Sequence, residues 1–397
     1  MIAPQLHECV GSALVAMGPE IFLSILPLKL EVEDQAEANV WVLPVLKQYT
    51  VGAHLSFFRG SILNILDLEG RIVSSRSCDA LVYSLWSLLP SFCNYPLDTA
   101  ESFKDLEKEL CTALCEEPNV CGIICSSLQI LIQQNKRILE GKIDLHGSDA
   151  STSRQRAMAH YTPQAAADNL NALKSSAREF LSVLSGNFLK SAQDGGCLQS
   201  TICELASIAD KEIVTRFFRN TMQKLLKVTQ EAGNAETSRN SNTMETDNSS
   251  NGSSLALVRA QLFDLAVSLL PGLNAKEIDL LFVATKPALR DDEGLIQKKA
   301  YKVLSIILRN CDTFLSAKFE ELLKLMIEVL PSCHFSAKHH RLECLYSLIV
   351  HASKCESEKR CDIISSFLTE IILALKEVSF VNCGALIESI GMVIFLA

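Results

Sequence analysis

Ser268-Leu269-Leu270-Pro271 ends an amphipathic run in this sequence, and phrases of the same kind end three others. The other copies are Ser24-Ile25-Leu26-Pro27, Ser87-Leu88-Leu89-Pro90 and Glu328-Val329-Leu330-Pro331. Proline has no amide hydrogen, and its ring crowds the carbonyl four residues earlier, so an aliphatic helix stops or bends where it meets Leu-Pro. Helices that stop repeatedly and turn into the next helix are typical of an α-solenoid.

The runs between these stops have the apolar spacing of helices. In Gln297 to Arg309, apolar side chains recur at i, i+3, i+4, i+7 and i+8, namely Ala300, Val303, Leu304, Ile307 and Leu308. Similar stripes run through 319–330, 342–349 and 363–375. Each stripe needs a neighbouring helix to cover it. We therefore predict an all-α, HEAT- or armadillo-like solenoid, a superhelix of helical hairpins.

The composition agrees with helices and disfavours sheets. Of the 397 residues, 59 are Leu, whereas only 17 are Gly and 11 are Pro. Strands joined by tight turns need Gly for positive φ angles and Pro for fixed ones, so this scarcity disfavours a β-sandwich or barrel. With 48% hydrophobic and 21% charged residues, the chain is too apolar for general disorder.

Changes in composition divide the chain into helical blocks. Helical repeats are predicted over 1–140, 163–230 and 255–397, with a loop over 141–162 between the first two. Residues 231–254 are rich in Asn, Ser, Thr, Glu and Gly and bury too little surface to offset their ordering entropy, which predicts a disordered loop. Residues 378–397 form an atypical apolar tail.

Net charge and cysteine content limit the class of protein. The formal charge is −9, whereas a protein that coats bare duplex normally carries a basic surplus. An odd number of cysteines, 15, scattered through apolar runs, indicates a reducing compartment. Neither a secretory signal nor an apolar run of membrane-spanning length is evident. We expect a protein of the cytosol or nucleus, without membrane contact.

Candidate chemistry is sparse, and the sequence predicts no enzyme, cofactor, metal or small-molecule substrate. Phosphate-binding glycine loops, nucleophile elbows and zinc-protease motifs are missing. Cys111, Cys115, Cys121 and Cys125 have helical spacing instead of zinc-knuckle spacing, which favours packing. The cluster Cys333, His334, His339, His340 and Cys344 is interpreted as part of a solvated basic turn that includes Lys338 and Arg341.

Two basic patches are the candidate binding residues. Residues 211–227 carry five cations against one acid, Glu212, with Phe217 and Phe218 interleaved. These cations are Lys211, Arg216, Arg219, Lys224 and Lys227. The second patch comprises Arg290, Lys298, Lys299 and Lys302. Either patch is suited to RNA phosphate or to a protein partner, and an ordinary solvated helix face remains an open alternative for both.

Several phrases resemble the ribosomal RNA-processing protein 12 family of HEAT/armadillo-repeat pre-ribosome factors, especially its plant members. Two are specific: Leu85-Trp86-Ser87-Leu88-Leu89-Pro90-Ser91-Phe92-Cys93-Asn94 and Gln297-Lys298-Lys299-Ala300-Tyr301. The resemblance extends from about Pro4 to Lys376 and corresponds to a central portion of longer family members. The tail after Glu377 departs from the family pattern, which continues into a basic helix start.

The resemblance implies a noncatalytic scaffold in ribosome biogenesis, located in the nucleus and nucleolus and able to shuttle to the cytoplasm. Implied partners are pre-ribosomal particles, rRNA and assembly factors. A transport GTPase or the export machinery is a further candidate partner. Two alternatives stay open because a solenoid displays surfaces without defining their use. They are a HEAT-repeat nuclear transport receptor or adaptor, and a cytosolic interaction scaffold unrelated to ribosomes.

Overall fold

The fold is described from a computed structural model that covers residues 4–30, 38–65, 76–142, 157, 159–191, 195–239, 249–353 and 365–371. Within these residues the chain is helical and contains no strand, which confirms the all-α prediction. The chain divides into two compact units, residues 1–214 and 215–397. The atypical tail, 378–397, lies outside the described residues.

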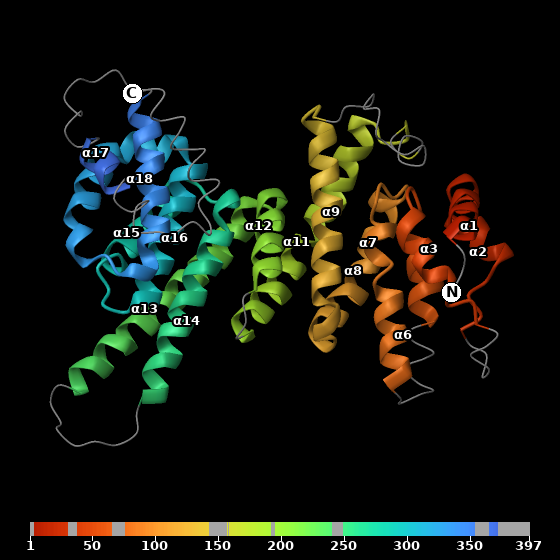
Figure 1. Cartoon of the computed structure of the whole chain (residues 1–397), viewed down its shortest axis with the longest axis horizontal. Coiled ribbons are helices and arrows are strands. Elements are labelled where there is room, and N and C mark those ends of the chain that lie inside the picture. The colour runs from red at the N-terminus through yellow and green to blue at the C-terminus, as the bar shows by residue number, and fades with distance from the viewer. Residues whose placement is uncertain are drawn as a thin grey trace. The chain divides into compact units, whose positions relative to one another are not determined.

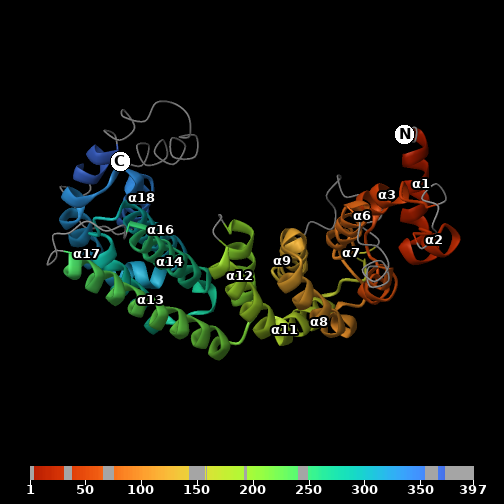
Figure 2. The same ribbon diagram turned by 90° about the horizontal axis from the view of Figure 1, so that it is seen from below.

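The helices of the first unit (Figure 1) pack in two rows, which are seen apart in Figure 2. One row contains α1 (Pro4–Met17), α3 (Val42–Tyr49), α7 (Leu89–Phe92), α9 (Cys121–Leu139) and α12 (Gly196–Ile208), in which each helix packs on the next. In the other row, α8 (Thr99–Glu116) packs on α11 (Pro163–Lys190). The other helical segments described in this unit are α2 (Pro19–Ile25), α4 (Leu55–Phe57), a π-helix at Phe58–Leu63, α6 (Arg76–Trp86) and a 3-10 turn at Pro118–Val120.

The second unit repeats this two-row arrangement. In one row α14 (Ser249–Ser268) packs on α16 (Gly294–Asn310), which packs on α18 (Lys338–Ser353). In the other, α15 (Ala275–Ala288) packs on α17 (Asp312–Glu328). Figure 2 shows α14, α16 and α18 side by side. Helices that alternate between two rows make a helical solenoid, as predicted. Helix α13 (Lys211–Arg239) begins at the end of the first unit and belongs mostly to the second.

The repeated Leu-Pro phrases do end helices. Helix α2 ends at Ile25, before Pro27. Helix α14 ends at Ser268 and α17 at Glu328, and each is followed by a short 3-10 turn that contains the proline, at Leu270–Gly272 and Leu330–Ser332. Helix α6 ends at Trp86, and Pro90 lies in the first turn of α7. The Leu-Pro phrases therefore mark helix ends, as the missing amide hydrogen of proline predicts.

The apolar stripe predicted on 297–309 is part of the core of the second unit. Ala300, Val303, Leu304, Ile307 and Leu308 are all at most 1% exposed. Gln297 and Tyr301 on the same helix are also fully buried. Helix α16 is covered on more sides than a single stripe requires, because α14, α15, α17 and α18 all pack on it.

The predicted disordered loop over 231–254 is wrong at both of its ends. Helix α13 continues to Arg239 and α14 begins at Ser249, while 240–248 lie outside the described residues. Propagating an existing helix avoids the cost of nucleation, so Glu231 and Ala232 extend α13 although they bury little surface. Most of the loop predicted at 141–162, namely 143–156 and 158, also lies outside the described residues.

Among the described residues, no single helix is both long and apolar enough to span a membrane. By length and composition alone, α1 and α2 taken together are long and apolar enough, but the two helices meet at a bend of 119°.

Candidate nucleic-acid interface

Helix α13 presents two chemically different faces. Val214, Phe218, Thr221 and Leu225 recur at spacings of three and four residues and are at most 5% exposed. Four cations of the predicted patch fall on the other side and are exposed, and we call them the α13 basic face: Arg216, Arg219, Lys224 and Lys227. The fifth predicted residue, Lys211, is exposed at the first turn of the helix, in the first unit.

The α13 basic face is only weakly neutralised by acids of the chain. Arg219 Nη2 lies 3.6 Å from Glu277 Oε1, and Lys227 Nζ lies 3.9 Å from Glu231 Oε1. The side chains of Arg219 and Lys227 both remain more than 60% exposed, so these ion pairs are weak. Arg216 and Lys224 form no ion pair with any described residue. The four cations are thus available to a negatively charged ligand.

The second predicted patch has a different environment. Lys299 and Lys302 converge on one carboxylate, Asp264 of α14, at 2.5 and 3.0 Å, and the Asp264 side chain is only 6% exposed. Arg290 pairs with Glu328 at 2.8 Å, and Lys298 alone is exposed without an ion pair among the described residues. The structure therefore places Lys299 and Lys302 in the contact between α14 and α16. Sequence adjacency gave no sign of Asp264, which lies 35 residues before Lys299.

The cysteine pairs on α8 and α9 do not share one environment. Cys125 is buried among apolar side chains, whereas Cys115 is exposed and Cys111 and Cys121 are half-buried. Packing therefore accounts for Cys125 but not for Cys115. Burial raises the pKa of Cys111 to about 12. A hydrogen bond from Cys125 lowers the pKa of Cys121 to about 7, against the opposing effect of its burial.

The turn before α18 differs from the predicted solvated basic turn. Arg341 is 1% exposed, because its guanidinium donates to Glu370, to Tyr301 and to the carbonyl of Met326. The prediction was therefore wrong for Arg341. His339 and His340 do lie together, and they converge on Glu343, a carboxylate that the sequence analysis did not single out. Arg309 also pairs with Glu343 at 2.9 Å and supplies a positive charge there.

The comparisons with known proteins agree on one family. Residues 2–191 match the family model described as Ribosomal RNA-processing protein 12, HEAT repeats. The chain is 27% identical to an RRP12-like protein of Gallus gallus, over 94% of this chain and 26% of the relative. It is 26% identical to an RRP12-like protein of Homo sapiens, over 97% of this chain and 27% of the relative.

The likeness extends to fungi. The chain is 24% identical to Ribosomal RNA-processing protein 12 of Saccharomyces cerevisiae, over 94% of this chain and 30% of the relative. It spans between a quarter and a third of the length of these relatives. The family model and the relatives together cover nearly all of the chain, and its helices pack as stacked pairs. Over nearly its whole length the chain is similar to members of the ribosomal RNA-processing protein 12 family of HEAT-repeat proteins.

Proposed function

We propose that this chain is a noncatalytic HEAT-repeat scaffold in ribosome biogenesis, which supports pre-rRNA processing and the maturation and export of ribosomal subunits. The proposal is supported by its relatives, which carry the name ribosomal RNA-processing protein 12, and by the two-row helical architecture. Stacked helical repeats expose long surfaces suited to large assemblies. The proposed partners are pre-ribosomal particles and assembly factors, and the proposed location is the nucleus and nucleolus.

The α13 basic face is the proposed rRNA contact. Its observed basis is that Arg216, Arg219, Lys224 and Lys227 are exposed together on one side of a helix whose other side is buried. Cations gathered on one helix face can neutralise neighbouring phosphates and release their counterions, which favours binding. Lys299 and Lys302 are weaker candidates because Asp264 already neutralises part of their charge.

A salt titration tests this contact directly. Binding of the chain to a single-stranded RNA oligonucleotide is measured at increasing salt, and log affinity is expected to fall with log salt by about 0.7 per phosphate contact. Replacing Arg216, Arg219, Lys224 and Lys227 with Gln is expected to reduce the slope by roughly 2 to 3. An unchanged slope contradicts the proposed contact.

A matched variant separates local from global charge. Lys47, Lys108, Lys190 and Lys324 are exposed and lie on four different helices, so replacing them with Gln removes the same net charge from scattered positions. This variant is expected to keep at least three quarters of the original slope, since long-range charge is screened at moderate salt. If both variants lose the same slope, binding depends on net charge alone.

The ribosomal part of the proposal is tested in cells. Crosslinking followed by sequencing of the bound RNA is expected to recover pre-rRNA, and imaging is expected to show the protein in the nucleolus. Recovery of no pre-rRNA above background contradicts the proposal. A pull-down with the transport GTPase in its two nucleotide states tests the proposed export role, which requires binding that depends on GTP.

A further inference from the structure

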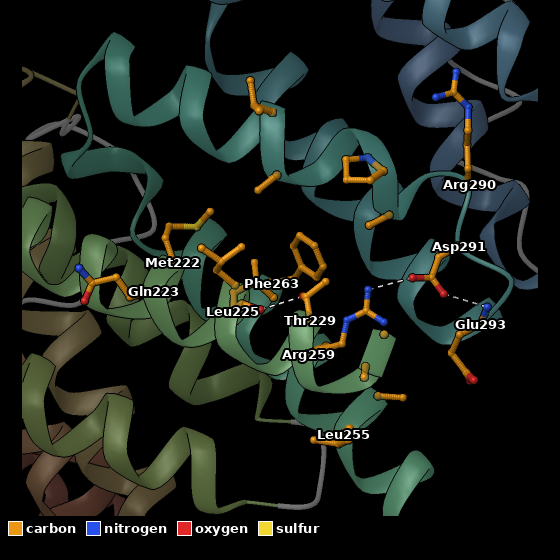
Figure 3. Close-up of a pocket in the computed structure, with 18 of the residues that line it drawn as sticks. Met222, Gln223, Leu225, Thr229, Leu255, Arg259, Phe263, Arg290, Asp291 and Glu293 are labelled. Atoms are coloured by element: carbon orange, nitrogen blue, oxygen red, sulfur yellow. Dashed lines mark hydrogen bonds and ion pairs between the residues drawn. The ribbon is translucent and has the colours of Figure 1, made fainter. Parts of the chain in front are cut away.

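A groove in the second unit lies between α13, α14 and α15 (Figure 3). Its volume is about 1300 Å³, and residues from these three helices and from 290–293 line it. Sites for small molecules typically have volumes of about 300 to 1,000 Å³. The size of the groove therefore suits a segment of polypeptide better than a small molecule.

Large aliphatic side chains stand exposed on two walls of this groove. Leu226 of α13 is 60% exposed, and Leu280 and Val283 of α15 are 46% and 58% exposed. Phe263 of α14 is buried beneath them, and Figure 3 shows it beside Leu225 and Met222. Single exposed aliphatics are common on protein surfaces, but several that line one concave site mark a place where another molecule binds.

The charges at the groove are distributed unevenly along its length. At the start of α15, Arg219 faces Glu277. Beyond the end of α15, Asp291 is paired with Arg259 at 2.9 Å and Arg290 with Glu328, so these four charges are matched within the chain. Asp292 and Glu293 are exposed and form no ion pair with any described residue. Glu293 caps the start of α16, whose positive dipole end offsets the negative dipole end of α15, so the two carboxylates themselves supply the negative charge at this end of the groove.

We propose that this groove binds an amphipathic helix of a partner protein, with aliphatic residues on one face and Lys or Arg at the end that lies against Asp292 and Glu293. The α13 wall, from Arg219 to Gly233, is about 20 Å long at 1.5 Å per residue, which matches a partner helix of about four turns. The exposed aliphatic side chains on the walls of the groove can interdigitate with the side chains of a partner helix. Apolar walls and unpaired carboxylates disfavour RNA at this site.

This inference goes beyond the proposed function, because it requires neither RNA nor ribosomes. The probe is a fluorescently labelled peptide of about four helical turns with Leu at i, i+3, i+4 and i+7 and two Lys in its last turn. The control peptide has Glu in place of those Lys. Fluorescence anisotropy with the full chain is expected to show saturable binding, at least about tenfold tighter for the Lys peptide.

Two pairs of variants locate the binding. L226E/V283E is expected to weaken binding of the Lys peptide by at least about tenfold, whereas Leu330→Glu, at a leucine outside the groove that is 47% exposed, is expected to leave the affinity unchanged. D292K/E293K is expected to reverse the preference between the two peptides. The matched change E116K/E117K, at exposed acids of the first unit, is expected to leave the preference as it is.

Three outcomes overturn the inference. They are the absence of saturable binding, equal affinity for the two peptides, and binding that survives L226E/V283E. All substituted positions are exposed, so each variant is expected to keep its helical circular dichroism. The RNA salt slope is measured on the unchanged chain without any peptide, so it does not depend on these outcomes. A failure here therefore leaves the proposed RNA contact standing.

Discussion

Arg341 of α18 is almost completely buried, although arginine is rarely found inside proteins without a partner. Its guanidinium forms a two-point contact with Glu370, at 2.6 and 3.0 Å, and also donates to Tyr301 Oη at 3.2 Å. Gln297 has a similar role in α16, because its amide donates to the Ser332 carbonyl and accepts from the His334 amide. Arg341 thus connects α18 to α16 and to the helical residues 365–371, whereas Gln297 connects the turn at 332–334 to α16.

Glu343 makes the stability of the second unit depend on pH. Burial alone raises the pKa of its carboxyl, but the hydrogen bond and charge of His340, with help from Ser305 and Arg309, outweigh burial and hold the pKa near 2. The folded pKa is below the ordinary value of 4.5, so the stabilisation is present above pH 4.5 and is lost as pH falls toward 2. Glu343→Gln is expected to lower the free energy of unfolding by about 2 kcal/mol at pH 6.

Urea unfolding between pH 6 and pH 2 measures this effect. The difference between Glu343→Gln and the unchanged chain is expected to shrink as the pH falls, because protonation removes the same charge that the substitution removes. Glu116→Gln, at an exposed acid of α8, serves as the control and is expected to change stability by less than about 0.5 kcal/mol. A difference for Glu343→Gln that stays constant down to pH 2 contradicts the argument.

At the scale of elements, α16 organises the second unit, because helices from both rows pack on it. Apolar side chains supply most of this contact, as Val303, Leu304 and Ile307 are fully buried. The capping box of Asn274 and Glu277 fixes the start of α15 beside it. Asp264 adds a polar connection between α14 and α16 through Lys299 and Lys302.

Removing the Asp264 charge is expected to weaken the packing of α14 on α16. Asp264→Asn leaves two partly buried ammonium groups without a carboxylate, which is expected to cost about 2 to 4 kcal/mol in the free energy of unfolding. Lys298→Gln, at the exposed neighbour, is expected to change it by less than about 0.5 kcal/mol. Urea unfolding of both variants measures the difference, and equal stability refutes a structural role for this carboxylate.

At the scale of the whole molecule, the chain is divided into two compact units. Each has its own aromatic contacts between helices. Phe103 and Phe180 lie 6.0 Å apart between α8 and α11, and Phe282 and Phe314 lie 5.2 Å apart between α15 and α17. In a repeat protein, stability is the sum of repeat and nearest-neighbour terms, so damage in one unit is expected to remain local.

Two cavity variants test this independence. Phe180→Ala is expected to cost about 3 to 5 kcal/mol and to accelerate amide hydrogen exchange in α8, α9 and α11 while α14 to α18 keep their protection. Phe282→Ala is expected to do the reverse, with faster exchange confined to the second unit. Exchange that accelerates across all helices after either substitution shows that the two units open together.

The helical fold was predictable because its causes are local. Leu-Pro phrases end helices because proline lacks an amide hydrogen. Apolar residues three and four apart form a helix face that must be covered, and this holds before the covering helix is known. The α13 cations were identified from their number in residues 211–227, and the structure places Arg216, Arg219, Lys224 and Lys227 on one exposed face. The loop over 231–254 was predicted too long because composition carries no information on where an existing helix stops propagating.

The amino-acid sequence by itself determined the helix class, the principal helix ends and the similarity to one family. Only the tertiary structure decided which charges are already paired, since Asp264 lies 35 residues from Lys299, and Glu370 lies 29 residues from Arg341. It also decided where aliphatic side chains stay uncovered, as in the groove between α13, α14 and α15. Periodicity shows which face of a helix is apolar, whereas the packing of helices distant in sequence determines whether that face is covered.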